Sequence, residues 1–281
     1  MDYVLPGEVV SDALNAAVKK ASLSPSDMLI RGALAGAFLG YATSLVFVAL
    51  SQGLPGLVGA IIFPVGFVIL VLLGFELATG NFALLPAALM DRRISAGSMI
   101  RNWVWVYIGN LIGSLLYAVL FYLAITSFGA NNGAALGDQL RAAAERKTLA
   151  FAALGMGGLG TAFIRAMLCN WMVTVGTVLS FTSRSTIGKI VAMWLPITIF
   201  FAHGYEHSIV NMFVIPAGML LGANVSIGQW WFWNQIPVTL GNILAGALFT
   251  GAALWYTYGR KQATVSRTSE AASRVAVAAG D

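Results

Sequence analysis

The stretch Gly204-Tyr205-Glu206-His207-Ser208-Ile209-Val210-Asn211 interrupts a long apolar run that extends from Ile190 to Leu221. It contains an acid and an imidazole, and His203, the other histidine of the chain, directly precedes it. An ionisable side chain at membrane depth costs free energy, so such residues are candidates for functional sites. Histidine also titrates nearest to neutral pH. The stretch therefore predicts a membrane protein that handles protons or small ions, with His207 and His203 as candidate pore residues.

The composition indicates a lipid environment. Hydrophobic residues make up 58% and charged residues 10% of the 281 residues, and the mean hydropathy is +0.81. Soluble domains carry roughly 25% charged residues. The net charge of +5 comes without a basic motif, so no nucleic-acid partner is expected.

Apolar stretches predict an all-α membrane protein with six transmembrane helices. They fall at about 28–50, 57–77, 103–128, 159–181, 190–221 and 236–258. Polar residues break the second near residues 76–81 and the fifth near residues 203–208. We expect a cytoplasmic segment with a surface helix at 1–27, a channel domain at 28–258 and a polar cytoplasmic tail at 259–281.

Lysine and arginine gather in alternate connections between these stretches. They precede the first span and follow the second, fourth and sixth, whereas residues 51–56 and 222–235 carry no charge. The positive-inside rule then places both termini in the cytoplasm. The connection 129–157, expected to be a loop, departs from this pattern because it contains Arg141, Arg146 and Lys147.

The two halves of the chain share an ordered motif. The segment 74–76 followed by Asn81 matches 204–206 followed by Asn211, and residues 108–113 match 240–245, at offsets of about 130 residues. A duplicated unit of three spans must be inverted relative to the first copy. Inverted repeats with broken helices are typical of transporters and channels. The sequence predicts an inverted 3+3 repeat, with copies at about 28–128 and 159–258.

Glu76 and Glu206 are the only acids within the predicted spans. Their matching positions predict a shared structural task, such as accepting hydrogen bonds from amides freed at each break, with Asn81 and Asn211 in support. His207 has an apolar counterpart in the other half, and this departure from the repeat favours a specific function.

Three further polar side chains lie at or near the predicted breaks. Thr79 supplies a hydroxyl in the first break, and Asn170 and Asn242 place amides within the fourth and sixth spans. Buried amides need partners. They could orient His207 or bond helices together.

Two alternatives deserve comparison with a channel for ions. Residues 203–207 match H-x-x-E-H, the inverted zincin pattern, which would make an intramembrane zinc protease. That site needs a further acid and a regular helix, but only Glu270 and Asp281 follow, and Gly204 weakens the helix. We expect no metal and no enzymatic activity. A neutral-solute channel usually has a filter arginine and paired Asn-Pro-Ala turns, which neither break contains.

Residues 28–258 resemble the formate/nitrite transporter family. The resemblance rests on four ordered motifs: residues 76–81, 168–171, 204–212 and 236–242. It implies an aquaporin-like protomer of six helices, assembled as a homopentamer in the inner membrane with one pore per protomer. It also implies passage of small weak-acid anions with protons, namely formate, nitrite, hydrosulfide and sometimes lactate or acetate. No cofactor is implied, and membrane lipids are expected partners.

The resemblance assigns residues to the pore. It implies a central pore histidine, a threonine at the first break, two accompanying amides, a lysine near the outer vestibule and an aromatic constriction, at His207, Thr79, Asn170, Asn242, Lys147 and Phe200 respectively. Two positions differ from many family members: Ala78 replaces a bulky residue and His203 replaces a small or amide residue. Residues 210–216 are similar to formate-type members, so formate is the expected substrate and nitrite or hydrosulfide the alternative.

Overall fold

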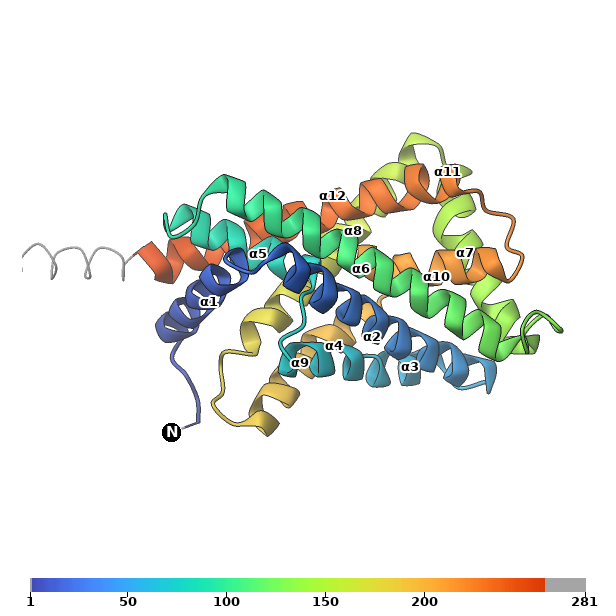
Figure 1. Ribbon diagram of the computed structural model, residues 1–281, viewed down its shortest axis with the longest axis horizontal. Helices are drawn as coiled ribbons and strands as arrows, with labels where there is room; N and C mark the ends of the chain where they lie inside the picture. The colour runs from blue at the N-terminus through green and yellow to red at the C-terminus, as the bar shows by residue number, and fades with distance from the viewer. Residues whose placement is uncertain (1, 261–281) are drawn as a thin grey trace, which may run out of the picture.

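The computed structural model describes residues 2–260, which form packed helices with a single isolated β-bridge between Tyr3 and Ser183 (Figure 1). Within these residues no extended strand is present, and the all-α prediction is confirmed. Most of the predicted polar tail at 259–281 lies outside the described residues.

Four helical stretches among the described residues are long and apolar enough to cross a membrane. They are α2 (Pro25–Ser51), α6 (Ala96–Ile125), α8 (Met156–Leu179) with the residue before it, and the stretch Ile227–Gly259. The last is one continuous helical stretch in which α-helical and π-helical segments alternate. Its α-helical segments are α11 (Ile227–Trp230) and α12 (Ile236–Ala245), and its π-helical segments are η1 (Trp231–Gln235), η2 (Gly246–Ala252) and η3 (Trp255–Gly259). At 1.5 Å per residue, each exceeds the roughly 30 Å hydrocarbon core.

Shorter apolar helices occupy the two regions predicted to be broken. The first contains α3 (Gly56–Ile62), α4 (Pro64–Leu72) and α5 (Ala78–Met90), and the second contains α9 (Thr186–Ala202) and α10 (Ser208–Leu220). Gly74 and Gly204 follow α4 and α9 with φ of 69° and 64°, a conformation that glycine adopts without steric cost. Leu77 and His207 then take nearly identical extended dihedrals, φ −115° and −114°, before α5 and α10.

The connection predicted as a loop at 129–157 is largely helical. Helix α7 (Ala134–Ala152) fills it and packs against α10. Alanine, leucine, arginine and glutamate favour helix formation, but the segment is too polar to register as an apolar span. Its buried face includes Leu140, Ala144 and Phe151.

The N-terminal segment contains α1 (Pro6–Ala21), which packs its apolar face against α5. Leu14 and Ala17 are buried there with Leu84 and Leu85. Ahead of this helix, the Asp2 carboxylate accepts hydrogen bonds from the connection between α8 and α9. Those bonds, chiefly from the Ser183 hydroxyl, hold the pKa of the Asp2 carboxyl below its usual range.

Glycines allow α2 and α6 to approach closely. A Cβ atom added at Gly109 would lie 2.7 Å from the carbonyl oxygen of Leu29, and one at Gly113 would overlap the carbonyl oxygen of Ala33. Small residues at such crossings let helix backbones pack directly in membranes. The α2–α6 contact is the most extensive between any two helices of the described residues.

We expect Gly113→Ala to lower stability, because the new methyl group would push α6 away from α2. Overpacking of this kind costs about 1–3 kcal/mol. The matched control is Gly160→Ala in α8, where a Cβ atom would meet nothing within 4 Å. Thermal unfolding of detergent-purified protein, followed by tryptophan fluorescence, measures both. Equal unfolding midpoints for the two variants would contradict the close approach of α2 and α6.

Candidate pore site

His207 and Thr79 meet between the beginnings of α5 and α10. The Nε2 atom of His207 lies 3.1 Å from the Thr79 hydroxyl oxygen, and both side chains are buried. The N-terminus of a helix carries unpaired amides and a partial positive charge that favour anions. Two helix N-termini, a hydroxyl and an imidazole thus lie together in the protein interior.

The backbone selects the tautomer of His207. The amide of Val210 donates a hydrogen bond of 3.1 Å to His207 Nδ1, so the imidazole caps α10. A ring nitrogen that accepts a hydrogen bond carries no proton. A neutral His207 therefore holds its proton on Nε2, which faces the Thr79 hydroxyl.

Aromatic rings cover one side of the imidazole. Phe200, near the end of α9, stacks on His207 at 5.8 Å between ring centroids with the planes 24° apart. Phe63, between α3 and α4, meets Phe200 edge-on at 5.7 Å. Both phenylalanines are almost fully buried. Phe63 therefore packs against the ring that stacks on His207.

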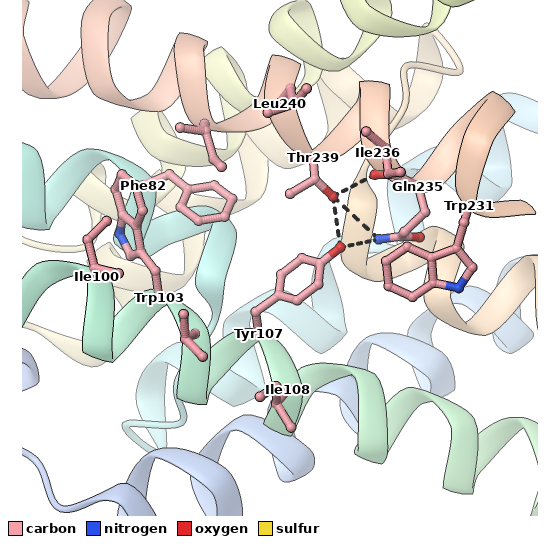
Figure 2. Close-up of a pocket in the computed structure, with 12 residues that line it drawn as sticks. Phe82, Ile100, Trp103, Tyr107, Ile108, Trp231, Gln235, Ile236, Thr239 and Leu240 are labelled. Atoms are coloured by element: carbon pink, nitrogen blue, oxygen red, sulfur yellow. Dashed lines mark hydrogen bonds between the residues drawn. The ribbon is translucent and has the colours of Figure 1, made fainter.

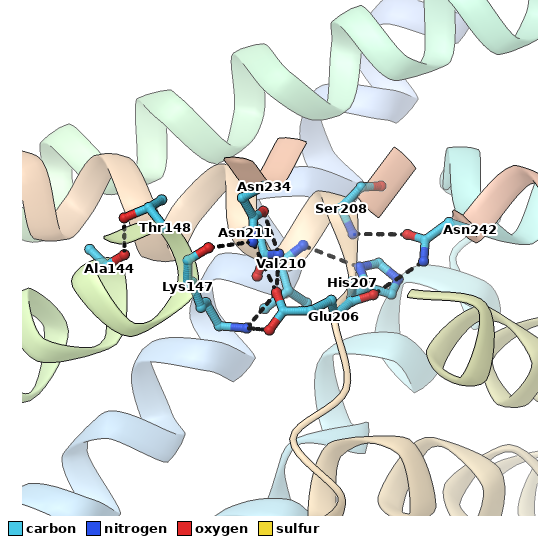
Figure 3. A network of polar contacts seen from close by, with 10 residues as sticks. All are labelled: Ala144, Lys147, Thr148, Glu206, His207, Ser208, Val210, Asn211, Asn234 and Asn242. Carbon is cyan, nitrogen blue, oxygen red and sulfur yellow. Dashed lines mark hydrogen bonds and ion pairs between the residues drawn. The ribbon is translucent and has the colours of Figure 1, made fainter. Parts of the chain in front are cut away.

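Asn242 fixes the break that leads into α10. Its Oδ1 accepts a hydrogen bond of 2.9 Å from the amide of Ser208, and its Nδ2 donates at 3.1 Å to the carbonyl oxygen of Glu206 (Figure 3). Nδ2 also donates at 2.8 Å to the carbonyl oxygen of Ala166. The asparagine takes the freed amide of Ser208, a role suggested for the glutamate. The Glu206 carboxylate instead accepts from Lys147 and from side-chain amides.

Asn110 makes the same set of bonds at the other break. Its Oδ1 accepts from the amide of Ala78 at 3.0 Å, and its Nδ2 donates to the carbonyl oxygens of Glu76 and Gly32, both at 2.8 Å. The partners of Asn110 correspond to those of Asn242: Ala78 to Ser208, Glu76 to Glu206, and Gly32 to Ala166. This correspondence agrees with the motif match between residues 108–113 and 240–245.

Glu206 lies at the centre of a polar cluster beside α10. Its carboxylate accepts from Lys147 Nζ at 3.0 Å on both oxygens, from Asn211 at 2.7 Å and from Asn234 at 3.1 Å (Figure 3). Asn234 also donates to the carbonyl oxygen of Lys147. The Glu206 side chain is nearly buried. These side-chain donors compensate the negative charge of its carboxylate. Because Lys147 lies on α7 and is ion-paired, it is not a free charge on a loop.

Glu76 has an equivalent cluster beside α5. Lys20 Nζ and Asn81 Nδ2 each donate to its carboxylate at 2.8 Å. Asn81 also bonds Asn102, which in turn donates to the carbonyl oxygen of Lys20. Sequence reasoning missed the four residues Lys20, Asn102, Asn110 and Asn234. The repeat offset could have identified the asparagines, but Lys20 lies outside the predicted spans.

Asn170 bonds helices together without touching the imidazole. Its Nδ2 donates to the carbonyl oxygens of Thr79 at 3.2 Å and Asn242 at 2.6 Å. Its Oδ1 is buried and has no partner among the described residues. Asn170 therefore acts on Thr79 through the backbone, in agreement with the helix-bonding alternative.

His203 points away from this centre. It ends α9, is exposed, stacks on Tyr205 and shares a 2.8 Å hydrogen bond with the carbonyl oxygen of Ile199. Gly204 leaves the helix with positive φ, so residues 203–207 lack the regular helix that a zincin requires. Within residues 2–260 no three His, Cys, Asp or Glu side chains cluster as metal ligands. The described residues thus do not form the helical pair of ligands that the inverted zincin pattern requires.

A cavity of about 230 Å³ approaches the site from the side of α1. Leu77 and Gly80, which flank Ala78 and Thr79 in sequence, line it together with Phe67 and two lysines, Lys20 and Lys189. A larger groove of about 430 Å³ lies on the outer face of α6 and α12, where Tyr107 bonds Thr239 and Gln235 (Figure 2). Its lining includes no residue of either break, 74–80 or 203–208, so it is separate from the site.

We expect Asn242→Ala and Asn110→Ala to destabilise the protein similarly. Each leaves one amide and two carbonyl groups at a break without these partners, and an unpaired buried group costs about 1–3 kcal/mol. Thermal unfolding in detergent measures the loss, with the exposed Asn224→Ala as control. A large effect from only one of the two variants would contradict their structural equivalence.

Comparisons of sequence relate the chain to known proteins. The profile of the formate/nitrite transporter family matches residues 7–256. A probable formate transporter of Methanothermobacter thermautotrophicus is 38% identical over 250 residues, covering 82% of this chain and 88% of the relative. The formate channel FocA of Escherichia coli (strain K12) is 31% identical over 284 residues, covering 92% and 96%.

Solved structures share the fold. An ion channel of the same family superposes with a TM-score of 0.78 at 27% identity, covering 89% of this chain and 98% of the other. A pentameric formate channel with formate bound gives a TM-score of 0.67 at 27% identity, covering 83% and 97%. The fold and site define a helical membrane transport protein. The chain belongs to the formate/nitrite transporter family.

Proposed function

We propose that this protein is a channel for small monovalent weak-acid anions, with formate as its main substrate. The observation that carries the proposal is the buried contact between His207 and Thr79 at the beginnings of two helices. Relatives named as formate channels and transporters support the choice of formate. Nitrite and hydrosulfide are the alternative substrates.

The proposed architecture has six spans. Helices α3, α4 and α5 form one broken span, and α9 and α10 form another, so that residues 28–258 make a channel domain with an inverted repeat. The matched bonds of Asn110 and Asn242 support this repeat. We also propose a homopentamer in the inner membrane with cytoplasmic termini; the pentameric relative supports the assembly, and the positive-inside rule supports the orientation.

The desolvation of an anion sets the mechanism. A bare carboxylate that enters an apolar constriction loses its hydration at a large cost in free energy. The Thr79 hydroxyl and the helix N-termini supply hydrogen bonds and favourable potential near His207. A proton reaches the anion there, directly or through water, and the neutral acid then passes the rings of Phe200 and Phe63 at a much lower cost.

We expect His207→Ala to change both the rate and the pH dependence of formate flux. The variant removes the Nε2 proton that faces Thr79 and the cap of α10. Uptake of labelled formate into proteoliposomes at several pH values measures the effect, with Leu240→Ala on the outer helix face as control. Competition by nitrite and hydrosulfide in the same assay ranks the substrates. Unchanged rate and pH dependence would refute the role of His207.

We also propose that Lys147 attracts anions at the outer vestibule of the pore. Lys147 forms an ion pair with Glu206 as well, so a test must distinguish this structural role from the attraction of anions. We expect Lys147→Ala alone to reduce stability, because Glu206 loses its cation; breaking a buried pair costs about 3–5 kcal/mol. The double variant Lys147→Ala/Glu206→Gln should regain stability yet take up formate slowly at low concentration. Thermal unfolding and initial uptake rates measure the two effects. Wild-type uptake by the double variant would remove the proposed attraction.

A further inference from the structure

We propose that Lys189 makes the mouth on the side of α1 an anion-collecting site for small carboxylates. The inference extends the proposed function, since it rests on anions passing between His207 and Thr79. It assigns a ligand-binding task to a residue outside both polar clusters.

The mouth is the cavity of about 230 Å³ that reaches the first break. Helices α1, α4, α5, α8 and α9 each contribute to its wall. Figure 1 shows α1 and α5 near one end of the molecule and α7 near the other. Among its lining residues are two lysines and no acid. An anion on its way to Thr79 therefore meets a pocket with positive potential.

The two lysines differ in how their charge is compensated. Lys20 Nζ lies 2.8 Å from the buried carboxylate of Glu76, so much of its field is cancelled. Lys189, in the first turns of α9, is half-buried and makes no ion pair with any of residues 2–260. Asp2, whose carboxylate lies beside Gly188, accepts hydrogen bonds from Ser183 and neighbouring amides and makes no ion pair with Lys189.

The repeat gives this lysine no counterpart. Glu206 and Glu76 correspond between the halves, and the same offset pairs Lys189 with Gly59. A Cβ atom at Gly59 would lie 2.6 Å from Val46 Cγ1, so the α3 position has no space for a side chain. The mouth on the α1 side thus holds a lysine paired with glutamate and, in Lys189, a second lysine that makes no ion pair with the described residues. Lys189 therefore adds a positive charge at this mouth that the repeat does not supply at the corresponding position.

A fixed cation in a cleft with low-dielectric walls raises the local concentration of anions. The effect weakens when salt shortens the Debye length from about 30 Å at 0.01 M to about 3 Å at 1 M. Lys189 should therefore lower the KM for an anion presented on its own side. It should do less for one presented on the other side.

The first test measures formate KM from each side of oriented membrane vesicles. We expect Lys189→Met to raise KM on the Lys189 side by about threefold or more at low salt, with a smaller change from the other side. Lys189→Arg should stay near the wild-type value. Lys19→Met, which removes the same charge from an exposed position outside the cavity, is the control. High salt should reduce the difference between Lys189→Met and wild type.

The second test does not depend on formate transport. Ser180 lines the same cavity, so Ser180→Cys reports its potential through reaction with sulfonate-bearing and trimethylammonium-bearing methanethiosulfonates. We expect Lys189→Met to lower the ratio of anionic to cationic reaction rates several-fold, and Lys19→Met to leave it unchanged.

The outcomes separate the two proposals. If wild-type protein carries no formate, the proposed function fails, and the thiol ratio still decides the role of Lys189. A ratio insensitive to Lys189→Met, or a KM that rises equally from both sides, would overturn the inference. A one-sided KM increase with a reduced ratio, both weakened by salt, would establish it.

Discussion

The structure depends on satisfying the backbone groups that the segments leading into α5 and α10 expose in the protein interior. Amide and carbonyl groups at such breaks cannot use helical hydrogen bonds, and in lipid no water replaces them. Asn110 and Asn242 solve this problem with the same three hydrogen bonds each. Because one asparagine bonds both sides of a break and a neighbouring span, it fixes where the following helix begins. That position in turn places Thr79 opposite His207.

The two buried glutamates are likewise compensated by matching sets of hydrogen-bond donors. Glu76 and Glu206 would be costly alone in the interior, but each receives one ammonium and amide donors. The carboxylates therefore hold the neighbouring side chains in place, and they add little net negative potential at the breaks. This compensation makes a carboxylate beside an anion path physically acceptable.

Sequence reasoning recovered the parts of the fold that composition and spacing determine. Polar residues within apolar runs predicted where α5 and α10 begin, and the shared motif predicted that Glu76 and Glu206 would have matching environments. It did not find α7, because hydropathy identifies apolar spans and this helix is polar on one face.

The partners of the site residues required coordinates. An amide within a span can bond any neighbouring helix, so nothing in the sequence specified that Asn242 would take the amide of Ser208. Lys20 and Glu76 are far apart in the chain, and their pairing depends on how α1 packs against α5. The family resemblance assigned both Thr79 and His207 to the pore. Residue spacing alone does not place the two side chains together.

Lys20 and Lys147 make equivalent bonds from helices at very different places in the chain. Lys20 lies on α1 and Lys147 on α7, yet each pairs with a buried glutamate and accepts from an asparagine through its carbonyl oxygen. The carboxylate of Glu76 therefore needs α1 as much as that of Glu206 needs α7, so the N-terminal helix is an integral part of the charged interior.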